Sequence, residues 1–183
     1  MHLSTTVGGV FLRELRMDDL DGFYSWQNDP EISQYYAFTR TPRTREAAKK
    51  ALASIVDGVD SESLHFAIVR RDPGENEEPF IGVVSLKNIH PIDRHAEFAT
   101  VICATEHMGK GYGRAASLCM IRHGFETLHL RKIYLSILAG NARVIHLYES
   151  MGFRYEGAFR KHVCRDGVCS DLLWYSLFPE ELR

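Results

Sequence analysis

Apolar and polar residues alternate along several short stretches of the chain, the pattern of strands that bury one face. This pattern predicts strands at 10–16, 64–71, 80–87, 131–138, 153–160 and 172–178, and a further long strand within 92–103. Elsewhere apolar residues recur every three to four positions, the spacing of an amphipathic helix. It predicts helices from Asp18 or Asp19 to Trp26, at 44–56, after Gly113 and at 141–151, with a short helical turn at 31–36.

Polar and turn-forming residues separate these elements at the expected places. Asn28-Asp29-Pro30 ends the first helix, because proline disfavours helical geometry in the residue before it. Thr44 and Asp57-Gly58 bound the second long helix, and Gly152 ends the last one. With no repeats or linkers, the order of elements predicts an α/β (α+β) single domain over 1–183. Its mixed sheet would have about seven strands, with helices on both faces.

Composition narrows the function classes. The 183 residues are 45% hydrophobic and 25% charged, ordinary values for a globular protein with a sizeable core. A net charge of -2 favours neither nucleic acid nor an anionic membrane as a partner. No apolar run approaches the roughly 20 residues that a membrane-spanning helix needs. The N-terminus shows no secretion signal, so we expect a cytoplasmic protein.

The cysteines and histidines indicate neither a disulfide framework nor a metal site. Four cysteines (Cys103, Cys119, Cys164, Cys169) include no CxxC pair, which predicts reduced thiols. The nine histidines show no HExxH pattern or ligand cluster, so no metal is expected.

Residues 109–113 read Gly-Lys-Gly-Tyr-Gly and lie between a predicted strand and a predicted helix. This arrangement directs the free N–H groups of the first helical turn at a phosphate. Three alternating glycines each cost about 1 kcal/mol of backbone entropy relative to alanine, so a simple connection would not need them. We therefore expect a phosphorylated group at 109–114.

Two other phosphate-binding patterns fit less well. A P-loop requires GxxxxGK followed by Ser or Thr, and no such string occurs. Residues 111–116 do satisfy the dinucleotide fingerprint GxGxx(G/A). That fingerprint also wants an acidic residue about 20 positions on, but 131–140 contains no carboxylate. A nicotinamide-dependent oxidoreductase is therefore disfavoured.

Two linked motifs resemble the GNAT superfamily of N-acetyltransferases. Residues 108–113 (MGKGYG) resemble its acyl-CoA pyrophosphate loop, (Q/R)xxGx(G/A), and 141–153 (NARVIHLYESMGF) resemble its second signature at the right separation. Residues 94–98 (RHAEF) resemble the spermidine and ribosomal-protein acetyltransferase branch. One departure is Met108, where the family usually has Gln or Arg. Backbone amides do most of the phosphate binding, so we expect cofactor binding to survive this change.

The resemblance implies an acyl-CoA N-acyltransferase fold, acetyl-CoA as cofactor and direct acetyl transfer to a primary amine in a ternary complex. Glu97 would deprotonate the amine and Tyr148 would assist the leaving thiolate. The alternatives are an ion pair of Glu97 with Arg94 or Arg131, and a purely packing role for Tyr148. The cofactor would contact Val101, Ile102, Cys103, Met108, Gly109, Lys110, Gly111, Tyr112, Gly113, Arg114, Asn141 and Tyr148.

The acceptor side would comprise Trp26, Tyr35, Tyr36, Arg160 and Trp174. The basic residues of 40–50 disfavour a polyamine and suit an anionic amino sugar carrier or an acidic peptide end, unless they only form a solvated helix face. Partners would be a small-molecule or peptide amine, and a homodimer is plausible. A non-catalytic acyl-CoA-binding module with the same fold is the alternative function.

Overall fold

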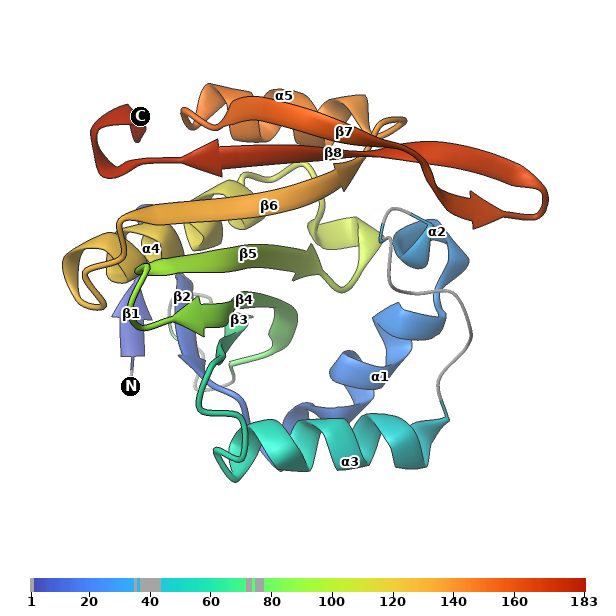
Figure 1. The fold of residues 1–183 in the computed structure, drawn as a ribbon. Coiled ribbons are helices and arrows are strands. Elements are labelled where there is room, and N and C mark those ends of the chain that lie inside the picture. Colours follow the sequence, from blue (N-terminus) through green and yellow to red (C-terminus); the bar gives the residue numbers. More distant parts are fainter. Residues whose placement is uncertain (1, 35, 37–43, 72–73, 75–77) are drawn as a thin grey trace.

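The computed structural model describes residues 2–34, 36, 44–71, 74 and 78–183 (Figure 1). One sheet with the strand order β1-β2-β3-β4-β5-β6-β8-β7 runs through the described chain. Neighbouring strands are antiparallel except for β5 and β6, which are parallel. The strands are β1 His2–Ser4, β2 Val10–Glu14, β3 Leu64–Arg70, β4 Phe80–His90, β5 His95–Ile102, β6 Lys132–Leu138, β7 Arg154–Arg165 and β8 Val168–Leu177.

Some of the helices begin at a residue whose side chain caps them. Thr44 Oγ1 accepts from the backbone N–H of Ala47 (3.1 Å), and Asp29 Oδ1 accepts from that of Glu31 (2.9 Å). The helices are α1 Leu20–Asn28, α2 Pro30–Ser33, α3 Arg45–Val56, α4 Tyr112–Glu126 and α5 Ala142–Ser150. Short 3₁₀ turns lie at Met17–Asp19, Thr105–His107 and Pro179–Glu181.

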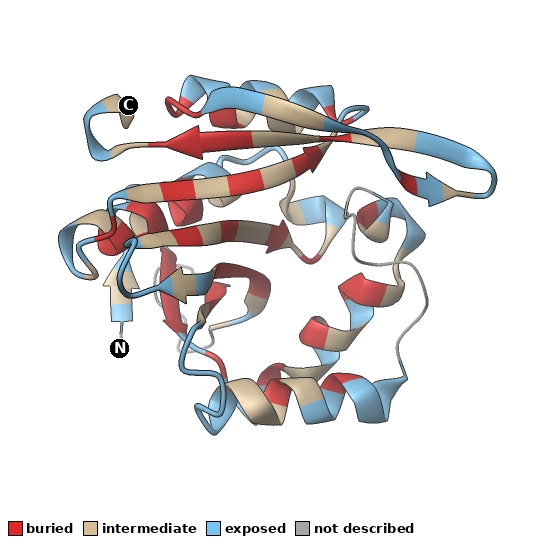
Figure 2. Cartoon of the chain, in the orientation of Figure 1, coloured by how far each residue is buried: buried red, intermediate tan, exposed pale blue. Residues whose placement is uncertain are grey.

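Alternation along the strands produces a separate core on each face of the sheet (Figure 2). In β2, Val10 and Leu12 join the core that α4 and α5 cover, whereas Phe11 joins the core under α1, α2 and α3. Burying an aliphatic or aromatic side chain of this kind contributes roughly 1.5–3 kcal/mol. The mixed sheet with helices on both faces confirms the predicted fold class.

The parallel pair at the centre of the sheet is short. Paired positions between β5 and β6 run only from His95↔Lys132 to Glu97↔Tyr134. Beyond them the two strands diverge (Figure 1), and β6 continues instead along β8 to Leu138. Among the described residues, the last five positions of β5 therefore have no strand on that side.

Several predicted boundaries were wrong. The described sheet has eight strands rather than about seven, because residues 2–4 pair with β2. The first predicted strand ends at Glu14, where Arg13 holds the next turn through two bonds to Asp19 (2.8 and 2.7 Å). The strand expected within 92–103 begins at His95, since residues 91–94 form the turn after an extended β4.

The prediction of four reduced cysteines was also wrong. Cys164 and Cys169 form a disulfide across the β7–β8 hairpin, whereas Cys103 and Cys119 are free thiols. The hairpin turns at Asp166-Gly167, which both have positive φ, and this places the two cysteines at directly opposite positions. A search for CxxC spacing misses such a pair, because the two cysteines lie one strand pair beyond the two-residue turn. The cysteines therefore no longer support the cytoplasmic expectation.

Candidate active site

The site is organised around the end of β5 and the glycine turn that follows it. Gly109 and Gly111 have φ of +77° and +83°, a conformation that costs other residues roughly 1–2 kcal/mol. A Cβ on Gly111 would meet nothing within 4 Å, so backbone conformation alone demands glycine there. The turn is thus specialised in shape, as the sequence indicated, although crowding is not the reason at Gly111.

Gly111 is the N-cap of α4, a helix of 15 residues. The first bond at this end of the helix runs from the N–H of Ala115 to the carbonyl oxygen of Gly111 (3.0 Å). The N–H groups of Tyr112, Gly113 and Arg114 therefore come before the helical ladder and point out of its N-terminus. Together with the helix dipole they favour an anion, and Lys110 and Arg114 are exposed nearby.

Sequence reasoning missed one cation at this turn. A Cβ on Gly109 would lie 3.4 Å from Nη2 of Arg143, so the guanidinium of Arg143 lies beside the turn. Arg143 is exposed on α5, within the second of the two motifs. Its position in that motif was the available signal. A guanidinium can bind a phosphate through two parallel hydrogen bonds.

Met108, the departure from the family pattern, is half-buried and packs against the core that α1, α2 and α3 cover. The side chain at the first loop position therefore contributes apolar packing here.

Asn141 is buried and begins α5. Its Oδ1 accepts from the N–H of Val144 (3.3 Å), so the side chain caps the helix. Its contact with a cofactor stays a prediction.

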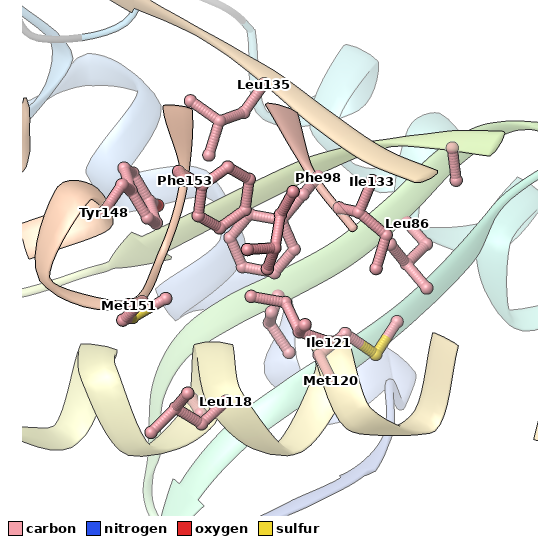
Figure 3. Packing of buried hydrophobic residues seen from close by; sticks show 14 of the residues in the cluster. Leu86, Phe98, Leu118, Met120, Ile121, Ile133, Leu135, Tyr148, Met151 and Phe153 are labelled. Atoms are coloured by element: carbon pink, nitrogen blue, oxygen red, sulfur yellow. The ribbon is translucent and has the colours of Figure 1, made fainter. Parts of the chain in front are cut away.

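Tyr148 lies in the core between the sheet and α5 (Figure 3). Its ring packs edge-to-face against Phe98 (centroids 5.9 Å apart) and Phe153 (5.4 Å). Burial raises the pKa of the Tyr148 phenol well above its usual value, and the nearby Ser117 hydroxyl opposes this by a smaller amount. The phenol is therefore neutral at physiological pH and can act as a hydrogen-bond donor.

Tyr36 packs on the opposite face of the sheet from Tyr148. Its hydroxyl donates to the carbonyl oxygen of Thr100 on β5 (3.1 Å), and its ring meets Trp26 edge-to-face. Burial raises the pKa of the Tyr36 phenol, and negative charge on Tyr148 or Cys103 would raise it further. Tyr36 and Cys103 belong to the same core, beside the end of β5.

A cavity of about 260 Å³ lies on the α1 and α3 side of the sheet. Its floor comes from β3, β4 and β5, and its walls come from α1, α3 and Tyr36. The lining is largely apolar and aromatic, and comprises Phe23, Trp26, Gln27, Tyr36, Ile55, His65, Val83, Ser85, Lys87, Ala99, Thr100 and Val101. The described lining residues include no carboxylate.

Two polar lining residues contact each other on the floor of the cavity. His65 Nδ1 lies 2.7 Å from Ser85 Oγ, at paired positions of β3 and β4. Burial lowers the pKa of the His65 imidazole, Asp60 partly opposes this, and Lys87 adds to it. His65 is therefore a neutral imidazole at pH 7.

Glu97 lies at the edge of this floor. Its two carboxylate oxygens accept from Lys87 Nζ (3.3 Å) and Asn88 Nδ2 (3.1 Å). Glu97 thus forms an ion pair, as one alternative predicted, but its partner is Lys87 on β4 rather than Arg94 or Arg131. Lys87 lines the cavity, but Glu97 is not among the described lining residues.

The predicted acceptor residues divide into three groups. Trp26 and Tyr36 line the cavity. Tyr35 lies outside the described residues. Trp174 is half-buried against Tyr134 and Phe159, and Arg160 is exposed on β7. Neither residue is among the described lining residues. Sequence reasoning missed the contributions of β3 and β4, because no local pattern shows which strands are neighbours.

In the described part of the chain, the basic residues of 40–50 are not among the residues that line the cavity. Arg40 and Arg43 lie outside the described residues. Arg45 forms an ion pair with Asp21, and Lys49 and Lys50 are exposed on α3. For those two lysines, the alternative of a solvated helix face fits the structure.

A group of possible metal ligands does meet elsewhere, contrary to the expectation that the histidines form no ligand cluster. His90, Asp93 and His95 have ligand atoms within 4.8 Å of one another at the β4–β5 turn. The Asp93 N–H already donates to His90 Nδ1 (3.0 Å). The group lies at the opposite end of β5 from the glycine turn, so it has no part in the site described above.

Comparisons with known proteins agree with this geometry. A family model described as "Acetyltransferase (GNAT) domain" matches residues 10–154. The chain is 30% identical over 172 residues to spermidine N(1)-acetyltransferase of Escherichia coli K12, covering 94% of this chain and 87% of that protein. It is 35% identical over 162 residues to the putative ribosomal N-acetyltransferase YdaF of Bacillus subtilis, covering 85% and 82%.

Among solved structures, the fold matches Vibrio cholerae spermidine N-acetyltransferase in complex with CoA and spermine. The TM-score is 0.83 at 26% identity, and the match covers 96% of this chain and 98% of that one. Within the described residues, none of the helices is long and apolar enough to cross a membrane.

Proposed function

Because the chain belongs to the GNAT acetyltransferase family, an acetyl-CoA-dependent class, we propose that it acetylates the primary amine of an acceptor bound in the cavity. The cavity borders β5 at residues 99–101, just beyond the point where β5 leaves β6. This is the observation that carries the proposal. A thioester held along the open edge of β5 would meet an amine that enters from the cavity.

The residues around β5 fit the cofactor. The N–H groups at the N-terminus of α4 would bind the pyrophosphate, with Lys110, Arg114 and Arg143 supplying charge. The pantetheine arm would add to the open edge of β5 like an extra strand, pairing with the backbone of Val101, Ile102 and Cys103. An amide of this segment would polarise the thioester carbonyl.

The transfer itself is a direct attack in a ternary complex. The amine nitrogen forms a bond to the acetyl carbon, and the carbon–sulfur bond breaks. Tyr148 would donate a hydrogen bond to the departing sulfur. With a phenol pKa raised above its usual value of about 10, Tyr148 stabilises a thiolate of pKa near 8.5 as a donor and need not transfer its proton.

The cavity favours an acceptor with one amine on an apolar or aromatic body. Binding of a polycation would need carboxylates, and the described lining residues include none. They do include Lys87, whose positive charge disfavours a polycation. The undescribed residues 35 and 37–43 also contain no Asp or Glu in their sequence. Small aromatic amines and peptides whose first residue is apolar fit this description.

Polyamine acetylation is the second candidate. Its support is similarity to proteins named spermidine N-acetyltransferases, including the structure with spermine.

The test is thiol release from acetyl-CoA with a matched panel of amines. Phenethylamine, a peptide with an N-terminal phenylalanine, spermidine and a nucleotide-linked amino sugar would be compared by kcat/KM. The expected result is at least about a tenfold preference for the first two over spermidine, roughly 1.4 kcal/mol. A preference for spermidine contradicts the proposed acceptor class. CoA binding without thiol release across the panel supports the non-catalytic module.

We also propose that residues 1–183 form one acetyltransferase domain. The family match over 10–154 and the single sheet that includes β7 and β8 support this.

A further inference from the structure

We propose that His65, held by Ser85, takes the proton from the ammonium group of the acceptor before the amine attacks. This rests on the proposed function, because it assigns the proton acceptor for an amine bound in the same cavity. Glu97 is the residue that the sequence suggested for this role.

His65 and Glu97, the two candidates for the proton acceptor, differ in their position relative to the cavity. His65 and Ser85 both line the cavity, on the same stretch of floor as Ala99, which is paired with Ser85 across β4 and β5. Glu97 lies two pairs further along the strands and already accepts from Lys87 and Asn88. An ammonium group in the cavity would therefore meet the imidazole, while the carboxylate is held by its own partners.

The 2.7 Å contact with Ser85 orients the imidazole. In the tautomer where Nδ1–H donates to Ser85 Oγ, Nε2 is the nitrogen left to accept a proton. Ser85 is thus a positioning residue, and His65 is the group that contacts the substrate.

The surroundings keep the imidazole neutral. Burial lowers its pKa, Lys87 from β4 acts in the same direction, and Asp60 before β3 opposes them. The lining residues of α1 and α3 (Phe23, Trp26, Gln27, Ile55) carry no charge, and Tyr36 has a raised pKa. At neutral pH the imidazole is therefore unprotonated and available to accept.

The proton balance is complete without another reactant. An ammonium group has three N–H protons and the product amide has one. His65 takes the first and later releases it to solvent. The nitrogen then attacks the acetyl carbon, the carbon–sulfur bond breaks, and the second proton ends on the CoA thiol.

Such an acceptor matters because an alkyl amine has a pKa near 10.4, so only roughly 1 in 2,500 molecules is neutral at pH 7. General base catalysis typically contributes 10²–10⁴-fold. The benefit disappears as the pH approaches the pKa of the amine, when the substrate arrives already deprotonated.

The experiment compares the wild type, His65→Gln and the matched control His123→Gln. The pKa of His123 is likewise lowered by burial, but this residue packs against Phe66 on the other face of the sheet. For each protein, kcat/KM for phenethylamine is measured from pH 6 to 10, and CoA affinity is measured separately. In His65→Gln, kcat/KM should be about 100-fold lower than in the wild type at pH 7, and most of this difference should disappear by pH 10. Its CoA affinity should be unchanged. His123→Gln should follow the wild-type pH profile.

A second pair of variants distinguishes loss of the base from misfolding, because only loss of the base depends on pH in the expected way. His65→Asn should repeat the pH-dependent loss, and Ser85→Ala should show a smaller loss of the same shape. A loss in His65→Gln that stays constant across pH, or no loss at all, overturns the inference while leaving the proposed function intact. A wild-type protein that acetylates no amine overturns both.

Discussion

Lys87 Nζ lies 3.3 Å from Oε1 of Glu97, at paired positions of β4 and β5. The pair links the cavity, which Lys87 lines, to the carboxylate that the sequence suggested as a catalytic base. Both side chains are partly exposed, so the pair contributes at most about 1 kcal/mol to stability. Its main consequence is that the charge of Glu97 is already compensated.

The first prediction concerns Glu97. Glu97→Gln should reduce kcat/KM at pH 7 by less than His65→Gln does, because it removes a partner of Lys87 and leaves the imidazole in place. Steady-state rates for both variants over the same pH range check this. If Glu97→Gln instead loses turnover mainly at lower pH and His65→Gln does not, Glu97 is the base.

The second prediction concerns Tyr148. Tyr148→Phe should lower kcat by about 10–100-fold, since one transition-state hydrogen bond is lost, while CoA affinity stays within about twofold. The melting temperature should change little, because phenylalanine fits the same contacts with Phe98 and Phe153. Rate measurements, calorimetry with CoA and thermal unfolding test these three points. Full activity in Tyr148→Phe would leave Tyr148 only a packing role.

The third prediction concerns the glycine turn. Gly111→Ala should weaken CoA binding by roughly 5- to 30-fold, because φ of +83° is unfavourable for alanine by roughly 1–2 kcal/mol and relief of that strain would move the turn. Gly140→Ala is the matched control, since Gly140 has no positive φ and a Cβ there meets nothing within 4 Å. Arg143→Ala should weaken binding less, with an effect that shrinks at high salt. Equal CoA affinities of Gly111→Ala and Gly140→Ala would argue against a phosphate site here.

The fourth prediction concerns Arg165 in the β7–β8 hairpin. Its guanidinium donates to the carbonyl oxygens of Ser33 (3.3 Å), Gln34 (2.7 Å) and Tyr36, so it holds one wall of the cavity. Arg165→Ala should raise KM for the acceptor several-fold and lower stability by about 1–3 kcal/mol, with CoA affinity preserved.

Arg160→Ala is the comparison for that variant, because Arg160 is exposed on the same strand and is not among the described lining residues. A rise in acceptor KM in Arg160→Ala as well would place Arg160 in the acceptor site. An unchanged KM in Arg165→Ala would show that the anchored wall does not affect acceptor binding.

The fifth prediction concerns pH and stability. The pKa values of His65 and His123 are lowered by burial below the usual value of about 6.5. The unfolded chain therefore binds more protons than the folded one as the pH falls below about 6.5, and stability decreases there. Thermal unfolding should show a lower melting temperature at pH 5 than at pH 7.5. His65→Gln and His123→Gln should each reduce that difference, and an unchanged difference in both would contradict the assignment.

Local pattern was sufficient for most elements and for the position of the glycine turn. Alternation located the strands, Thr44 marked a helix start that the structure confirms, and the glycine turn leads directly into α4. These features depend on residues that are close in the chain, so their physical causes are visible in the sequence. The extra strand β1 and the longer β7–β8 hairpin were missed because their pairing partners decide them.

The sequence by itself therefore determined the pattern of strands and helices, the glycine turn before α4 and the family resemblance carried by residues 108–113 and 141–153. Only the tertiary structure decided that His65 meets Ser85, that Lys87 rather than Arg94 or Arg131 pairs with Glu97, and that Arg143 lies beside Gly109. It also joined Cys164 to Cys169. Strand order and register set these contacts, and they follow from packing the whole chain rather than from any one segment of it.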